Sequence, residues 1–93
     1  MSPALFSSLQ VGTKVARNRL FVPPMCQYTL ENRDGVANYE TAQHYGALAR
    51  GGWGAIIVEA TAVAPAGRIT HWDLGLWNER QAQAMEPIVA DIK

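Results

Sequence analysis

Apolar residues follow one another along the chain in two different patterns, which predict short strands alternating with helices. Leu9 to Val15 alternates around Gly12-Thr13, and this pattern predicts a small hairpin. Leu20-Phe21-Val22 is an apolar run that predicts the first strand of the main fold. Ala55-Ile56-Ile57-Val58 is a second such run, typical of a strand that is buried on both faces of a parallel sheet.

Two other stretches have apolar residues at helical spacing. The first runs from about Asn38 to Arg50 and ends at Gly51-Gly52, a helix stop. The second begins at Asn78, where Gln81 three residues later predicts a capping box. Pro87 lies inside the second stretch, so we expect a kink there or a break into two helical pieces.

The segments between these elements are predicted to be loops. Thr29 to Ala37 is polar and contains turn-forming residues. Thr61 to Trp77 is long for a connection from strand to helix, and long loops at strand ends are usually functional. The order hairpin, strand, helix, strand, helix is that of a parallel α/β fold. Two such units cannot close a barrel, since a (β/α)8 barrel needs about 250 residues. We therefore predict the first third of a larger parallel α/β protein, with residues 1–93 in one domain.

Composition excludes several classes of function. The chain has 93 residues with eight basic and eight acidic side chains, so nothing predicts binding to nucleic acid or to an anionic membrane surface. No apolar run approaches the roughly 18 residues that span a bilayer, and we expect a cytoplasmic protein. Cys26 is the single cysteine, which excludes an internal disulfide. Neither a Ser/His/Asp arrangement nor metal-ligand spacing is present.

The candidate chemistry lies in Pro23-Pro24-Met25-Cys26-Gln27-Tyr28, directly after the first predicted strand. Proline cannot donate to a strand ladder, so the sheet should end there. In α/β barrels the active site lies at the carboxyl ends of the strands. Cys26 could act on a ligand here, or it could be a small buried apolar residue, the usual fate of a free cysteine. Tyr28 could likewise bind a ligand or lie at the rim with its hydroxyl in water.

Several motifs occur in one order along nearly the whole chain: Asn18-Arg19-Leu20, Pro24 to Tyr28, Gly54 to Val63, Gly67 to Thr70, and Asp73 to Trp77. With these motifs the sequence resembles the N-terminal part of the old yellow enzyme flavoproteins. Within that family it resembles the thermophilic-like subgroup, which has a cysteine where other members have threonine.

The resemblance implies a (β/α)8 barrel that binds FMN at its C-terminal mouth and acts as an ene-reductase. Such an enzyme reduces the activated C=C bond of α,β-unsaturated carbonyl compounds with electrons from NADPH or NADH. By the same resemblance, the cofactor-binding residues are Pro23, Pro24, Met25, Cys26 and Ala60. Cys26 would lie on the reactive side of the flavin and tune it, and Tyr28 would present its phenol to the substrate. These two are the residues that the resemblance places in catalysis.

Other family functions do not map onto this chain. The histidine pair that binds the substrate carbonyl comes from a later strand, and neither His44, within the first predicted helix, nor His71, in a loop, matches it. The proton donor and the groups that bind the flavin phosphate are also outside the chain. Glu59 could be a general base, but we favour a structural role at the barrel rim. Trp72 and Trp77 could pack the second loop down or line a subunit contact, and we favour packing.

Two alternatives remain open. The chain could be a non-catalytic fragment that needs a complementary chain, the remainder of the barrel, in order to fold. It could also belong to another FMN-dependent barrel oxidoreductase, such as a dihydroorotate-type enzyme. Members of the resembled family form dimers and tetramers, so the full protein is expected to be a homo-oligomer.

Overall fold

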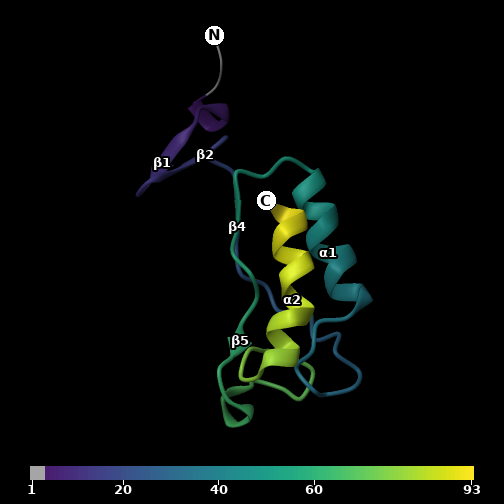
Figure 1. Cartoon of the computed structure of the whole chain (residues 1–93). Coiled ribbons are helices and arrows are strands. Elements are labelled where there is room, and N and C mark those ends of the chain that lie inside the picture. The colour runs from purple at the N-terminus through teal and green to yellow at the C-terminus, as the bar shows by residue number, and fades with distance from the viewer. Residues whose placement is uncertain (1–3) are drawn as a thin grey trace.

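Two helices lie side by side along one side of a series of short strands, and a hairpin projects from one end (Figure 1). The computed structural model describes residues 4–93. The elements are η1 (Ala4–Phe6), β1 (Leu9–Val11), β2 (Lys14–Ala16), β3 (Phe21–Val22), α1 (Tyr39–Arg50), β4 (Ala55–Ile56), β5 (Thr61–Ala62), η2 (Pro65–Gly67), β6 (Leu74–Gly75) and α2 (Glu79–Ile92).

The predicted hairpin is confirmed as the antiparallel pair β1 and β2. Leu9 pairs with Ala16 and Val11 with Lys14. Gly12 in the turn has φ of 61°, a left-handed conformation that glycine adopts at little cost. The hairpin lies at the end of the molecule opposite β5 (Figure 1), away from the carboxyl ends of the parallel strands.

β3 and β4 form the predicted parallel pair. Phe21 pairs with Ala55 and Val22 with Ile56. Hydrogen bonds continue the pairing at both ends: the Gly54 N–H donates to the Leu20 carbonyl at 2.8 Å, and the Ile57 N–H donates to the Val22 carbonyl at 3.0 Å. The pairing stops where Pro23 follows, because proline has no N–H to donate.

The expectation that the Ala55–Val58 run is buried on both faces is wrong for this chain. Ile57 is 51% exposed, and Ala55 and Ile56 are only half-buried. The reason lies in the layering: both helices cover the same face of the strands (Figure 1). Within the described residues no second layer of helices covers the other face.

Both helices begin with a capping box. In α1, the Thr41 N–H donates to the Asn38 side chain at 3.1 Å, and the Asn38 N–H donates to the Thr41 hydroxyl at 3.2 Å. In α2, the predicted pair is confirmed, because the Gln81 N–H donates to Asn78 at 2.9 Å. α2 continues through Pro87, so the expected break does not occur. Pro87 is exposed, and its missing N–H removes one hydrogen bond from the helix without ending it.

The segment from Thr61 to Trp77 is more ordered than the predicted loop. It contains β5 and β6, which pair in parallel with Thr61 opposite Leu74. Leu74 is fully buried, and Asp73 is 3% exposed and accepts hydrogen bonds from the Ile69 N–H at 2.7 Å and the Thr70 hydroxyl at 2.8 Å. Hydrophobic runs this short carry too little periodicity for a strand to be predicted.

Candidate functional site

The candidate site consists of the strand-end segment, defined here as Pro23–Tyr28, and of the residues that follow β4. Because β3 and β4 are parallel neighbours, their carboxyl ends lie at the same edge. This places the strand-end segment beside Glu59 and Ala60. The structure therefore brings together the residues that the resemblance assigns to the flavin.

The strand-end segment is open to solvent along its length. Pro23, Pro24 and Met25 are exposed, Met25 at 49%, and Cys26 is half-buried. Among residues 4–93, the backbone N–H groups from Met25 to Tyr28 donate to no protein acceptor. One side-chain hydrogen bond is formed inside the segment, from Gln27 Nε2 to the Met25 carbonyl at 3.3 Å. The segment thus offers an apolar edge and free backbone donors.

Tyr28 ends the segment with a left-handed backbone, φ of 55°, and is 46% exposed. This conformation is uncommon for a residue with a bulky side chain. The neighbouring Cys26 thiol, as a hydrogen-bonding group and then as a charge, raises the pKa of the Tyr28 phenol above 10.0, with smaller contributions from Asp73 and Glu59. The phenol is therefore protonated at neutral pH and available as a hydrogen-bond donor.

Glu59 has the structural role that we favoured. It is 5% exposed and accepts a hydrogen bond from the Tyr45 hydroxyl at 2.7 Å, while its own N–H donates to the same hydroxyl oxygen at 2.9 Å. Tyr45, on α1, is 1% exposed. Burial, more than the Glu59 carboxylate and Cys26, raises the pKa of Tyr45. This pair fixes the end of β4 against α1.

Neither histidine belongs to the site. His44 is half-buried and packs edge-on against Tyr45, with ring centroids 4.8 Å apart. His71 is exposed, as predicted for a loop residue.

The predicted packing role holds for Trp77, which is half-buried and lies against Gly35 and Gly75, whereas Trp72 is 39% exposed. The Arg33 guanidinium lies over the Trp72 ring, 5.1 Å from its centroid, and Arg68 lies over Trp77 at 5.4 Å. The Arg33–Trp72 contact joins the loop after β3 to the loop before α2. The Arg68–Trp77 contact lies within the segment between β5 and α2. At this distance a guanidinium is attracted to the face of an indole ring.

Sequence reasoning missed a connection between the two loops, which we call the Gln81 clamp: Asp34, Gly35, Gly75, Trp77 and Gln81. The Gln81 side chain was predicted only to cap α2, but its Nε2 also donates to the Asp34 carbonyl at 2.9 Å. The Gly75 N–H donates to the Gly35 carbonyl at 2.9 Å. A capping pattern gives no sign of a contact with a residue so distant in sequence. The one available signal was Gly35 within a polar loop.

Within residues 4–93, neither helix has the length and apolar character needed to cross a membrane.

Comparison with known proteins gives one consistent result. Residues 4–93 match the model of the NADH:flavin oxidoreductase / NADH oxidase family. The chain is 43% identical over 88 residues to an NADPH dehydrogenase of Listeria monocytogenes, covering 95% of the chain and 26% of that protein.

Solved structures agree with this match. Morphinone reductase superposes with a TM-score of 0.85 at 29% identity, over 97% of this chain and 23% of that one. An old yellow enzyme homologue from Zymomonas mobilis gives a TM-score of 0.85 at 30% identity, over 97% of this chain and 24% of that one. The chain thus spans about a quarter of the length of these relatives. The predicted fold class, α/β as part of a (β/α)8 barrel, is confirmed.

Proposed function

The chain belongs to the NADH:flavin oxidoreductase / NADH oxidase family, and from this premise we propose that it supplies part of the flavin and substrate site of an FMN-dependent ene-reductase. The proposed reductant is NADPH or NADH. The proposed substrate is a small activated alkene, an α,β-unsaturated carbonyl compound. The main supporting observation is the strand-end segment, which lies exposed at the common edge of β3 and β4 with its backbone donors free.

The residues present fit an isoalloxazine ring. Such a ring is flat and largely apolar, and it carries carbonyl oxygens and ring nitrogens that accept hydrogen bonds. The exposed Pro23, Pro24 and Met25 offer an apolar edge, and the unpaired N–H groups from Met25 onward offer donors. Because these exposed N–H groups have no protein acceptor, a polar ligand at this edge could accept hydrogen bonds from them without breaking any within the fold.

In this proposal the flavin is held by Pro23, Pro24, Met25 and Cys26 from one strand end, and by the backbone of Ala60 from the next. When bound, FMN supplies hydride chemistry, and the protein tunes it through hydrogen bonds and charges near the ring. Cys26 is one such group, because its thiol is a weak donor that is not bulky. It acts as a tuner and not as a nucleophile.

Tyr28 binds the substrate in this proposal. Reduction of an activated alkene places negative charge on the carbonyl oxygen in the transition state, and a hydrogen-bond donor aimed at that oxygen lowers the barrier. A tyrosine phenol is protonated at neutral pH even at its ordinary pKa of about 10, and the upward direction of the Tyr28 pKa does not change this. Tyr28 assists from the edge, since the groups that carry most of the polarisation are supplied by the remainder of the barrel.

A second proposal concerns the isolated chain: it is non-catalytic until it combines with the remainder of the barrel. The supporting observation is the open face of the strands, with Ile57 51% and Phe21 37% exposed. An apolar face of strands is stable when another layer of the protein packs on it, and the remainder of the barrel would supply that layer. The NADPH dehydrogenase and old yellow enzyme relatives favour an ene-reductase over a dihydroorotate-type enzyme. Cytoplasmic location and homo-oligomerisation remain predictions.

The visible absorption spectrum tests the first proposal. It is recorded anaerobically on the purified protein before and after addition of NADPH. A flavin band that bleaches with NADPH, and returns when cyclohexenone or maleimide is added, is the expected result. Turnover of dihydroorotate in place of these alkenes would contradict it. A chain without a flavin band that is unfolded by circular dichroism, and folds only with the remainder of the barrel, would support the second proposal.

A further inference from the structure

The Gln81 side chain is buried and both of its polar atoms form hydrogen bonds, although helix capping needs only one of them. It is 0% exposed. Its Oε1 accepts hydrogen bonds from the Trp77 N–H at 2.6 Å and the Asn78 N–H at 3.2 Å, which start α2. Its Nε2 points the other way and donates to the Asp34 carbonyl at 2.9 Å, in the loop that follows Tyr28. One amide therefore joins two loops.

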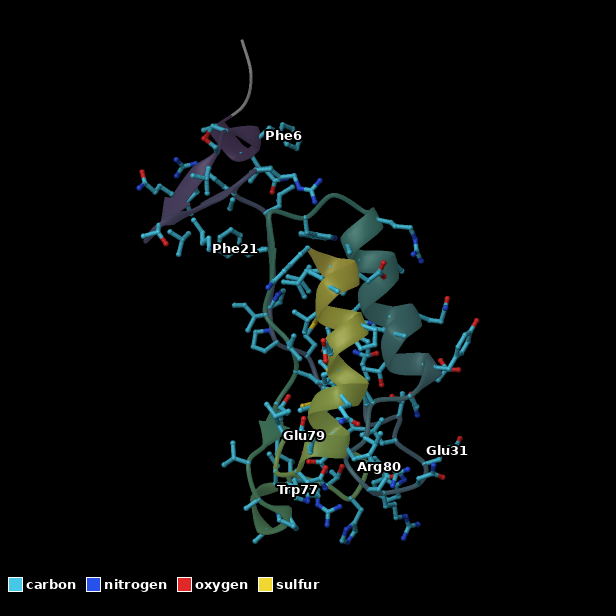
Figure 2. The ribbon with its side chains drawn as sticks, in the orientation of Figure 1. Phe6, Phe21, Glu31, Trp77, Glu79 and Arg80 are labelled. Carbon is cyan, nitrogen blue, oxygen red and sulfur yellow. The ribbon has the colours of Figure 1, made fainter. Side chains whose placement is uncertain are left out.

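Two glycines let the loops approach this amide closely. A Cβ atom on Gly35 would lie 2.6 Å from Gln81 Nε2 and 2.9 Å from the Trp77 ring. A Cβ atom on Gly75 would lie 2.8 Å from Gln81 Nε2. The same region includes the weak ion pair of Arg80 with Asp34 at 3.8 Å, and Figure 2 shows Trp77 and Arg80 together at this end of the molecule. The contact is therefore specific to these residues.

Between Tyr28 and Asp34, the chain is held at Thr29 and Leu30 by hydrogen bonds to other segments. The Asn38 side chain donates to the Thr29 carbonyl at 3.0 Å. Leu30 is 2% exposed, and its N–H faces the Trp72 carbonyl at 3.4 Å. A left-handed backbone such as that of Tyr28 costs energy and persists only where its surroundings determine it. The residues directly after Tyr28 are held by Asn38 at the start of α1 and by the loop before α2, which Gln81 joins to Asp34.

We propose that Gln81 is a positioning residue for substrate binding: by joining the loop after Tyr28 to the loop before α2, it fixes the Tyr28 phenol. This inference rests on the proposed function, which gives Tyr28 its contact with the alkene. Gln81 touches neither flavin nor substrate. Its effect on the reaction is therefore expected to pass entirely through Tyr28.

The test uses Gln81→Glu in the flavin-loaded protein. A glutamate keeps the oxygen that accepts from Trp77 and Asn78, so the start of α2 is preserved, but it loses the donor to Asp34. Gln83→Glu is the matched control, since Gln83 is an exposed residue of the same helix. We expect Gln81→Glu to raise KM for cyclohexenone about tenfold and to leave the rate of flavin reduction by NADPH unchanged. Gln83→Glu should change neither.

A double-mutant cycle with Tyr28→Phe separates positioning from general structural support. If Gln81 acts through Tyr28, the double variant should have the alkene kcat/KM of Tyr28→Phe alone. If the losses of alkene kcat/KM in the two single variants multiply in the double variant, the proposal is overturned. A slower reduction of the flavin by NADPH in Gln81→Glu would also overturn it.

Hydrogen exchange gives a readout that does not depend on activity. In the wild type, the amides of Leu30 and Gly75 should have the same protection factor, because the two loops that Gln81 joins should open together. In Gln81→Glu both should exchange at least tenfold faster. Unequal protection in the wild type would overturn the proposal even if Gln81→Glu does not fold. Absence of flavin reduction in the wild type would overturn the proposed function instead, and the exchange result would still decide whether the clamp exists.

Discussion

The strand-end segment and the Gln81 clamp both follow strands of the parallel fold, yet they use their polar groups in opposite ways. The clamp is buried, and both atoms of the Gln81 amide are paired within the protein. The strand-end segment is exposed, and within residues 4–93 its N–H groups from Met25 to Tyr28 donate to no protein acceptor. The difference shows that the polar groups of the first region are used within the fold, whereas those of the second are left without a protein partner. Substitutions that disturb the packing of the clamp should therefore lower stability, and those in the strand-end segment should, under the proposed function, change activity with little loss of stability.

The largest loss of stability is expected at Gly35. Gly35→Ala places a methyl group 2.6 Å from Gln81 Nε2 on a backbone with φ of 70°. Overpacking and backbone strain together should lower the free energy of unfolding of the assembled protein by about 3 kcal/mol. Urea denaturation measures this change.

Gly12→Ala is the control for backbone strain alone. Gly12 also has a positive φ of 61°, but nothing lies within 4 Å of the added methyl group. Gly12→Ala should lower the free energy of unfolding by about 1 kcal/mol. If Gly35→Ala and Gly12→Ala lower the free energy of unfolding equally, the methyl group at Gly35 meets no packing constraint in the clamp.

Tyr45→Phe should follow in size. It removes the hydroxyl that donates to Glu59 at 2.7 Å and accepts from the Glu59 N–H at 2.9 Å, leaving a buried carboxylate and a buried N–H without this partner. The expected loss is about 2 kcal/mol of unfolding free energy. Tyr39→Phe, at a residue of the same helix that is 73% exposed, should change it by less than about 0.5 kcal/mol. Similar effects of both changes would contradict the structural role of the Glu59 pair.

Alkaline pH should weaken the same pair. Burial raises the pKa of Tyr45 above its ordinary value of 10.0, so the folded state holds the phenolic proton more tightly than the unfolded state does. The resulting stabilisation is fully present below pH 10 and is lost as the pH rises above it. Unfolding measured from pH 8 to pH 12 should therefore show the advantage of wild type over Tyr45→Phe shrinking in the alkaline range. A constant difference would contradict the assignment.

The smallest change in stability is expected at Tyr28, within the strand-end segment. Tyr28→Phe removes a hydroxyl from a side chain that is 46% exposed, so the free energy of unfolding should change by less than about 0.5 kcal/mol. Under the proposed function, kcat/KM for cyclohexenone should fall about tenfold, since a donor to the developing negative charge is lost. The rate of flavin reduction by NADPH is the internal control. A stability loss like that of Tyr45→Phe, with unchanged alkene reduction, would reverse the comparison.

Local sequence signals were sufficient for much of the fold. The Gly12-Thr13 turn predicted the hairpin, and the Asn78 and Gln81 pair predicted the start of α2. Pro23 predicted where β3 ends. Each of these features depends on residues within a few positions of one another, so the sequence alone contains the interaction.

The errors have the opposite character. The run from Ala55 to Val58 looked fully buried, but Ile57 is exposed because both helices cover one face. The short strands β5 and β6 were missed because each consists of two residues that are held by a partner distant in sequence. Of the two outcomes predicted at Pro87, a kink or a break, the break does not occur, because α2 continues to Ile92.

The sequence by itself determined the order of the hairpin, β3, α1, β4 and α2, the helix starts and the position of the candidate chemistry at a strand end. The tertiary structure decided which polar groups are paired. Gln81 gained a second role from the Asp34 carbonyl, Glu59 gained its partner from Tyr45 on α1, and the donors after Pro24 were left free. The physical reason is that turns and caps are made by neighbours along the chain. Burial and hydrogen-bond pairing, in contrast, depend on which distant segments pack together.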